Sequence, residues 1–480
     1  MHFRPHPSGL PTLLRFAPLA AVICLALSCP KLLVAEPADV GRAANPTASP
    51  RPVVVGYFGQ WGVYEHFFVR NLVTSGAASR LDQMNYAQGS VAGGLCHVAD
   101  PNADLNLTFS AEDSVDGRPD SPTSTFRGNF HQLAELKQQF PRLRILISLE
   151  GHAADFALAA QPQNRPAFVA SCIDTFIRGH LPSATDAAPS AHPDLFDGID
   201  LDWEYPHPED AANYIALLTE LRRAMDAVRP GLRLSVAVGP APQMYPGVDI
   251  SAVAGTVDQI GIMNYDYSGP WSPNTGFLAP LFSTGGDSVD ASIRAYIAAG
   301  VPPSKLLMGI PFYGYGWREV ADTGHGLFQA GRPIRGDRPY SFFEPLTHPQ
   351  PAPGATPAEA PASTRSPVSL TPASDPAAGR QAPIRGAYVV YRDPQSQAPW
   401  LFDGSTFWTY EDPISIRAKV SFALQQRLGG VMAWELSEDS ATADLVKAVR
   451  TSLDARLPAM ERNATATQAG STARATSSTE

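Results

Sequence analysis

Eight apolar, β-branched segments alternate with amphipathic stretches along this chain, and each segment ends in Gly, Asp, Asn or an aromatic residue. Buried strands of this kind, separated by helical patterns, are typical of a parallel sheet covered on both faces. Eight of them favour an α/β fold closed into a (β/α)8 TIM barrel over an open, doubly wound sheet. The expected strands are Pro52–Phe58, Asp82–Ala87, Leu143–Leu149, Phe196–Trp203, Leu232–Val238, Val257–Tyr265, Leu306–Phe312 and Gly430–Glu435.

The amphipathic stretches predict helices that cover the outside of this barrel. The length of 480 residues would allow three domains, and the 44% apolar content is enough for a large core. The strand order instead favours one barrel over residues 51–455. The expected helices are Phe130–Phe140, Arg165–Arg178, Pro208–Val228, Val289–Ala299, Ser415–Leu428 and Asp439–Leu453.

The two ends of the chain are expected to lie outside the barrel. Residues 1–35 read as a signal peptide, because Arg4 and Arg15 precede an apolar run, 16–27, that is too short to span a bilayer. Residues 36–50 form a polar leader, and residues 456–480 form an Ala, Thr and Ser-rich tail that we expect to be disordered. The protein is therefore expected to be secreted, with a periplasmic location or a lipid anchor at Cys29 as alternatives.

Two cysteines, Cys96 and Cys172, remain beyond the expected signal peptide. In an oxidising compartment they could form a disulfide, but they could equally be two separate buried thiols. Because bridging depends on a distance that the sequence does not contain, both states stay open.

The charge balance excludes some classes of partner. With 36 basic and 46 acidic side chains the formal net charge is −10, whereas nucleic acids and anionic membranes attract positive surfaces. We therefore expect that the protein binds no nucleic acid, and no membrane unless Cys29 carries a lipid. We also expect a monomer.

Proline is concentrated in one internal segment, residues 345–383, which holds ten prolines among 39 residues. Proline stops helix propagation and removes ladder hydrogen bonds, so this segment is expected to be an extended or disordered loop.

The segment DGIDLDWEYP, residues 197–206, places acidic residues at alternate positions of an apolar strand. Side chains two apart share one face of a strand, so Asp200, Asp202 and Glu204 should project together into the barrel. Glu204 would stand at the carboxyl end of the strand, where active sites of this fold lie. Three carboxylates on one buried face are costly unless protons are shared, a metal is bound, or the chemistry requires them.

Two simpler interpretations of the acidic segment fit less well. A solvated surface strand would not interleave its acids with Ile199, Leu201 and Trp203. A calcium loop needs a turn with a central Gly, which an alternating strand lacks. A divalent metal site is therefore the less favoured interpretation of these carboxylates.

DGIDLDWEYP resembles the signature of family 18 glycoside hydrolases, the chitinases and their relatives. The resemblance extends over most of residues 52–453, through VVVGYFGQWGVY, MNYAQG, RGNFHQLAELK, FVASCID, IGIMNYDYSGPW, LLMGIPFYGYGW and LGGVMAWELSED. It implies cleavage of the β-1,4 bonds of chitin and N-acetylglucosamine oligomers, with retention of configuration and without metal or cofactor. In this family the substrate supplies its own nucleophile.

The resemblance assigns roles to residues of this chain. Glu204 would be the general acid, Asp202 would hold the substrate's acetamido N–H, and a deeper Asp200 would share a proton with Asp202. The hydroxyl of Tyr265 would hydrogen-bond the acetamido carbonyl. The expected substrate contacts are Trp434, as the floor of the subsite, Asp266, Met263 and, as a weaker candidate, Tyr57.

Members of the family often carry a small α+β insertion between strands seven and eight. The long interval from Trp317 to Gly430 fits such an insertion over residues 318–410, with the proline-rich segment as one of its loops. The tryptophans Trp61, Trp271, Trp317 and Trp400 could line an extended groove or could be packed in the core.

Two positions depart from the family pattern. Glu150 follows Ser148 and Leu149 where a glycine is usual, so it could crowd the barrel mouth or perturb the acidic cluster. Gln88 stands where an aromatic residue is common. We expect altered affinity or chain-length preference from them before any loss of activity.

Two other functions compete with that of a chitinase. A non-catalytic chitin-binding or oligosaccharide-binding protein could use the same barrel, although such relatives usually lose the acid. An endo-β-N-acetylglucosaminidase acting on N-glycans would share the acidic motif.

Overall fold

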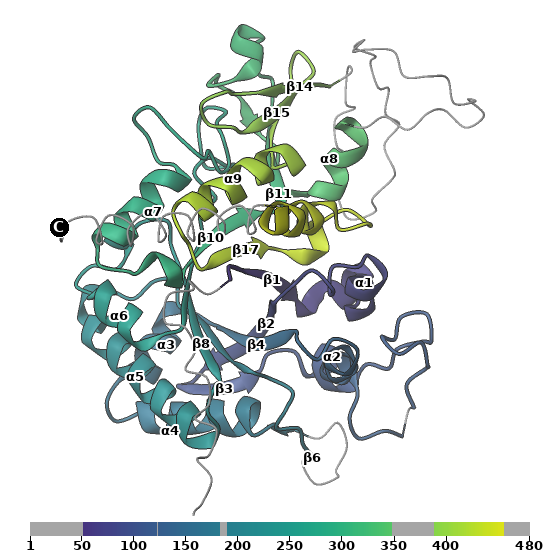
Figure 1. Cartoon of the computed structure of the whole chain (residues 1–480), viewed down its shortest axis with the longest axis vertical. Coiled ribbons are helices and arrows are strands. Elements are labelled where there is room, and N and C mark those ends of the chain that lie inside the picture. Colours follow the sequence, from purple (N-terminus) through teal and green to yellow (C-terminus); the bar gives the residue numbers. More distant parts are fainter. Residues whose placement is uncertain (1–50, 122, 183–189, 348–387, 456–480) are drawn as a thin grey trace, which may run out of the picture. The chain divides into compact units, whose positions relative to one another are not determined.

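The computed structural model describes residues 51–121, 123–182, 190–347 and 388–455 (Figure 1). The expected signal peptide, polar leader and C-terminal tail lie outside these residues. So does the proline-rich segment beyond residue 347.

Eight parallel strands form a closed barrel, because β1 pairs with both the second and the last strand of the ring. The predicted (β/α)8 barrel is thus confirmed, with strand ends shifted by a few residues. The largest shift is at β2, which continues to Ala92 where the sequence predicted an end at Ala87. The strand β9 ends at Ile262, so Met263 and Tyr265 belong to the following loop. In ring order the strands are β1 (Val53–Gly59), β2 (Gln83–Ala92), β4 (Arg144–Glu150), β7 (Gly198–Asp202), β8 (Arg233–Val238), β9 (Gln259–Ile262), β10 (Leu306–Pro311) and β17 (Gly430–Trp434).

Helices lie around the outside of these strands (Figure 1). The longest, α5, buries Tyr214, Leu217, Leu221 and Met225, whose three- and four-residue spacing makes one apolar face. No helix in the described part of the chain is long and apolar enough to cross a membrane. The helices are α1 (Val69–Thr74), α2 (Gly128–Gln139), α3 (Ala153–Ala160), α4 (Arg165–Cys172), α5 (Ala211–Val228), α6 (Ile250–Thr256), α7 (Val289–Ala298), α9 (Pro413–Gln425) and residues 444–455.

Each expected helix is present in the structure, with ends shifted by a few residues. Three further helices around the barrel, α1, α3 and α6, were not predicted from the sequence. Beyond Cys172, α4 continues as a π-helix, Ile173–Ile177, so the expected helix to Arg178 changes type along its length. The helices α1, α3 and α6 have eight residues or fewer, which is too short for periodicity to reveal them.

Between β10 and β17 the chain builds an antiparallel sheet in the order β12-β11-β16-β15-β14, with β13 paired to β11. The helix α8 (Tyr340–Thr347) follows β13 and contains Pro345, so the expectation of non-helical structure from Pro345 onward is wrong for these first residues. At this position the proline removes one intrahelical hydrogen bond, which its missing N–H would have donated to the carbonyl of Ser341. The strands are β11 (Tyr313–Arg318), β12 (Arg332–Pro333), β13 (Arg338–Pro339), β14 (Val389–Arg392), β15 (Pro399–Phe402) and β16 (Phe407–Thr409).

A disulfide joins Cys96 and Cys172, whose Cα atoms are 5.0 Å apart. Cys96 lies on β3 (Leu95–Val98), which forms a hairpin with β2, and Cys172 ends α4. Of the two states that the sequence left open, the structure therefore has the bridged one. Two further short strands, β5 (His180–Leu181) and β6 (Ser190–Ala191), follow Cys172 in the chain and pair with each other.

Replacing both cysteines, Cys96→Ser with Cys172→Ser, should lower the free energy of unfolding by about 2–5 kcal/mol, because the bridge spans 76 residues of chain. Denaturant unfolding of the oxidised wild type and the variant measures the difference, and a reductant should destabilise only the wild type. Equal stability of the two proteins under oxidising conditions would contradict the bridge.

Candidate active site

The strand β7 carries its acidic residues on the interior face. Asp200 and Asp202 are 1% and 9% exposed, whereas Glu204 lies beyond the end of the strand and is exposed. Trp203 points the other way, into the outer core, where its ring stacks on Phe156 with centroids 5.4 Å apart. The acids therefore rise from the buried interior of the barrel to its open carboxyl end.

Asp200, the deepest of the three, is held by hydroxyl groups from its two neighbouring strands, β4 and β8, and from β1 across the barrel. Tyr57 Oη and Ser148 Oγ donate to its Oδ2 at 2.7 and 3.0 Å, and Ser235 Oγ donates to its Oδ1. Ser148 and Ser235 lie opposite Asp200 in the registers of β4 and β8. Burial raises the pKa of Asp200, and these hydrogen bonds oppose the rise. Both carboxylate oxygens are thus fixed in place.

Asp202 has a different environment. Its Oδ1 is buried and accepts no hydrogen bond among the described residues. Burial raises its pKa well above the usual value, and the charges of Glu204, Glu150 and Asp200 raise it further. The neutral form of Asp202 is therefore favoured by its surroundings.

The segment that follows β9 faces these acids. Tyr265 is 7% exposed, and burial together with the charges of Asp202 and Asp266 raises its pKa well above 10, so its hydroxyl stays a donor. Asp266 has a left-handed backbone with φ 62° and accepts a hydrogen bond from Tyr313 Oη at 2.7 Å. Met263 is half-buried against the cluster that contains Tyr265.

Aromatic rings gather where β1 and β17 end. Trp434 is half-buried, and its ring centroid lies 5.3 Å from that of Tyr57 and 6.3 Å from that of Trp61. Tyr57, expected as a weak substrate contact, is 2% exposed and gives its hydroxyl to Asp200. Its place is therefore beneath the site, as a support for Asp200 and Trp434.

The remaining tryptophans divide between the two interpretations. Trp317 and Trp400 are 0% and 7% exposed within the apolar cluster of the antiparallel sheet, so they are core residues. Trp271 is 59% exposed and meets Tyr315 edge to face at 5.4 Å. Of these three, only Trp271 is available to a ligand.

Of the two departures from the family pattern, Glu150 lies close to the acids. Glu150 ends β4, and burial raises its pKa to about 7, with the charges of Asp200, Glu204 and Glu435 adding to the effect. Gln88 sits where the register of β2 against β4 shifts, between Ala87 and Gly89. The direction of the Gln88 side chain depends on this register shift, which no sequence pattern predicts.

Sequence reasoning missed several members of the site. Ser148 and Ser235 interrupt the apolar runs RILISLE and RLSVAV, and a lone hydroxyl in a buried strand is a signal that could have found them. Glu435, after β17, was not singled out, yet burial raises its pKa to about 7. Tyr313, the partner of Asp266, stood in the quoted LLMGIPFYGYGW without an assigned role.

One group of possible metal ligands occurs in the described part of the chain, formed by Asp120, His131 and Glu135, whose ligand atoms lie within 4.8 Å of one another. His131 Nδ1 lies 3.0 Å from Asp120 Oδ1, and its Nε2 lies 3.5 Å from Glu135 Oε1. Because each ring nitrogen faces a different carboxylate, the three side chains already satisfy one another. The group shares no residue with the acids of β7.

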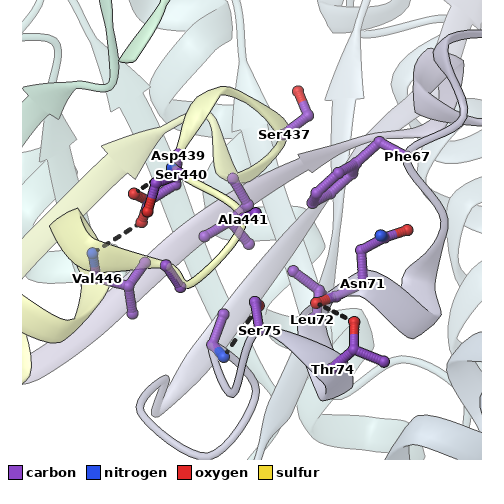
Figure 2. A pocket seen from close by; sticks show the side chains of 13 residues that line it. Phe67, Asn71, Leu72, Thr74, Ser75, Ser437, Asp439, Ser440, Ala441 and Val446 are labelled. Atoms are coloured by element: carbon purple, nitrogen blue, oxygen red, sulfur yellow. Dashed lines mark hydrogen bonds between the residues drawn. The ribbon is translucent and has the colours of Figure 1, made fainter. Parts of the chain in front are cut away.

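A cavity of about 350 Å³ lies between α1 and the start of the helix over residues 444–455 (Figure 2). One wall carries Asp439, whose Oδ1 and Oδ2 accept the backbone N–H groups of Leu445 and Val446 at 3.0 Å. That carboxylate caps the helix and is not free for other chemistry. None of the site residues expected from the sequence lines this cavity.

Comparison with protein families matches residues 53–439 to the glycosyl hydrolases of family 18. That range starts at the first residue of β1 and ends after β17, so it takes in the whole barrel and the sheet inserted before β17.

Similar proteins are named as chitinases. The chain is 32% identical over 421 residues to Chitinase C of Streptomyces lividans, covering 84% of this chain and 60% of that protein. It is 30% identical over 437 residues to Chitinase 63 of Streptomyces plicatus, covering 86% and 62%. It therefore spans only three-fifths of these relatives. Among solved structures, the catalytic domain of psychrophilic chitinase B from Arthrobacter TAD20 is similar, with a TM-score of 0.71 and 27% identity over 84% of this chain and 95% of that one.

Tyr57→Phe tests the support of Asp200. Loss of one donor to a buried carboxylate should lower the free energy of unfolding by about 1–3 kcal/mol, since the ring still packs on Trp434. Urea unfolding at neutral pH measures it. Tyr410→Phe is the matched control, because the Tyr410 hydroxyl is buried without a hydrogen-bond partner among the described residues, and its removal should cost nothing. Equal effects of the two substitutions would contradict the assignment.

Proposed function

The chain belongs to family 18 of the glycosyl hydrolases, and on that premise we propose that it is a chitinase, which cleaves β-1,4 bonds between N-acetylglucosamine units. The observation that carries the proposal is the ascending set on β7, with Asp200 fixed, Asp202 buried and Glu204 exposed. The chitinases named above, at 30% identity or more, support the substrate class.

Glu204 is the general acid in this proposal. Its exposed place at the mouth of the barrel is where a polymer can approach, and it gives its proton to the glycosidic oxygen as the bond to C1 breaks. The acetamido carbonyl oxygen of the same sugar attacks C1 and forms a cyclic oxazolinium. Water then opens that ring at C1 and returns a proton to Glu204, so the acid is regenerated.

Asp202 and Tyr265 make the substrate's own group a competent nucleophile. Asp202 lacks a donor to its Oδ1 among the described residues, so it can accept the acetamido N–H and stabilise the positive charge that develops on the ring. The neutral hydroxyl of Tyr265 donates to the carbonyl oxygen and orients it. Trp434 offers its half-buried ring to the apolar face of the cleaved sugar. Asp266 and Met263 are the further substrate contacts in this proposal.

We also propose that the protein works outside the cytoplasm. The disulfide between Cys96 and Cys172 supports an oxidising compartment, since such bridges are rare where thiols are kept reduced. The signal peptide expected over residues 1–35 agrees with this location.

Glu204→Gln should lower kcat on N-acetylglucosamine oligomers by about 10² to 10⁴-fold, because the amide has no proton to give, and should leave oligomer binding nearly unchanged. Turnover by chromatography and affinity by calorimetry separate the two effects. Glu209→Gln replaces another exposed glutamate in the same loop and should keep wild-type turnover. Unchanged turnover in the Glu204→Gln protein would overturn the proposal.

Oligomers that lack the acetamido group on the sugar at the cleaved bond should be inert, since the nucleophile is then missing. Incubation with chitin oligomers, their deacetylated counterparts and cellulose oligomers tests this, and a glycoprotein included in the series would reveal action on N-glycans. Cleavage of cellulose oligomers at a rate near that of chitin oligomers would contradict the mechanism.

A further inference from the structure

The loop that follows β9 carries two of the groups that the proposed mechanism uses. Residues 263–288 connect β9 to α7, and Tyr265 and Asp266 stand at the start of this loop. Loops are more mobile than the strands they follow, whereas a group that orients a nucleophile has to stay within about 0.5 Å of its working position. Contacts from outside the loop are therefore needed to hold Tyr265 in place.

The second half of the loop lies against its first half. The N–H of Tyr267 donates to the carbonyl oxygen of Leu278 at 3.1 Å. Leu278 and Ala279 are fully buried in the apolar cluster that also contains Tyr265. The position of residues 278–279 therefore helps to determine the position of Tyr265.

Lys419 reaches this second half of the loop from α9. Its Nζ donates to the carbonyl oxygen of Ala279 at 2.6 Å, between residues 140 positions apart in the chain. The same ammonium group donates to Oε1 of Glu411, which lies between β16 and α9. Lys419 and Glu411 are 1% and 2% exposed, so this ion pair is shielded from water.

The inserted sheet holds the loop at two further points. Thr409, the last residue of β16, accepts the N–H of Leu278 on its Oγ1 at 2.9 Å. β16 pairs with β11, and Tyr313 of β11 donates its hydroxyl to Asp266. Both halves of the loop are thus fixed by the inserted sheet and by the segment that leads from it into α9.

Stability alone gives a weak reason for a charged pair at this place. Desolvation of two buried ions offsets most of their attraction, and apolar residues of similar volume are often as stable. The pairing is also incomplete, because Glu411 Oε2 is buried without a hydrogen-bond partner among the described residues. What an apolar pair could not supply is the directed hydrogen bond from Lys419 to the carbonyl of Ala279.

We propose that Lys419, anchored by Glu411, is a positioning residue for Tyr265. Its hydrogen bond fixes residues 278–279, and these hold the start of the loop so that the Tyr265 hydroxyl meets the acetamido carbonyl oxygen of the substrate. The proposal rests on the proposed chitinase function for its catalytic consequence, and on the hydrogen bonds alone for the bracing of the loop.

Replacing both members of the pair, Glu411→Leu with Lys419→Met, removes the donor and leaves no buried charge, so this pair variant should fold. Its kcat on the N-acetylglucosamine hexamer should fall by about 10 to 100-fold, because a displaced Tyr265 orients the nucleophile poorly. KM should change by less than about threefold, since the affected interaction matters mainly in the transition state. A wild-type kcat in the pair variant would overturn the proposal.

A double-mutant cycle with Tyr265→Phe shows whether the pair acts through Tyr265. In the Tyr265→Phe background, the pair replacement should lower kcat by no more than about twofold, because the hydroxyl that the pair positions is already absent. A general loss of structure would lower kcat by the same factor in both backgrounds, and that result would overturn the role of Lys419.

Glu411→Gln separates positioning from stability. This substitution weakens the pairing of the buried ammonium but leaves Lys419 able to donate to Ala279. Its Tm should therefore fall below that of the wild type, whereas its kcat should stay within about threefold of the wild-type value. A kcat as low as that of the pair variant would contradict the proposal.

Lys137 and Asp197 provide a matched control at the amino end of β7. Lys137 Nζ donates to Asp197 Oδ2 at 2.8 Å and to the carbonyl oxygens of Asp194 and Leu195 at 2.6 and 3.2 Å. Lys137→Met with Asp197→Asn removes the same kind of ion pair far from Tyr265 along the strand direction, and should keep wild-type kcat. A fall in kcat equal to that of the Lys419 pair variant would overturn the assignment.

Amide hydrogen exchange tests the bracing without substrate. The N–H groups of Tyr267 and Leu278 should exchange at least about tenfold faster in the pair variant than in the wild type, because local opening becomes easier. Unchanged exchange would overturn the bracing. If the pair variant does not fold, Thr409→Val, which removes the acceptor for Leu278 N–H, should show the same faster exchange and the same dependence of kcat on Tyr265.

The two proposals fail in different ways. A wild type that is inactive on all chitin oligomers, with faster exchange in the pair variant, would overturn the proposed function and support the bracing of the loop. An active wild type whose kcat falls equally with and without the Tyr265 hydroxyl would overturn the role of Lys419 alone.

Discussion

Repulsion among carboxyl groups at the carboxyl end of a single barrel is the constraint on which the rest of the site depends. Asp200, Asp202 and Glu204 rise along β7, and Glu150 and Glu435 join them from β4 and β17. No basic group contributes to the raised pKa values of Asp200, Asp202 or Glu150. Such a cluster persists only if hydroxyl donors and retained protons take the place of countercharges.

The closed barrel supplies those substitutes by its register. Since β4 and β8 flank β7, their serines meet Asp200 from both sides, and Tyr57 reaches it from β1 across the interior. One layer higher, no hydroxyl donor reaches Asp202 Oδ1 among the described residues, and burial raises the pKa of this carboxyl group. The top of the column, at Glu204, is open to solvent and substrate. Along β7 the acidic residues thus change from a buried and hydrogen-bonded Asp200 to an exposed Glu204.

The barrel and the acidic face of β7 could be predicted from the sequence, because apolar runs and two-residue alternation are local signals. The contacts between side chains of different strands could not be predicted from it. That Ser148 and Ser235 support Asp200 depends on the register of β4 and β8 against β7, which the closed ring of strands sets. Trp317 was ambiguous for a related reason, since its burial depends on the sheet that residues far along the chain complete. Short helices and the type of structure around Pro345 were likewise beyond local patterns.

The central claim is that the substrate's acetamido group, and not a water molecule activated by one of these carboxylates, attacks the anomeric carbon. The charge of Glu204 acts on Glu150, so a water activated by Glu150 is the real competitor. The anomer formed first decides between them. Proton NMR of a chitin oligomer in the first minutes of hydrolysis should show the β anomer ahead of mutarotation. An initial α anomer would mean direct attack by water and would contradict this account.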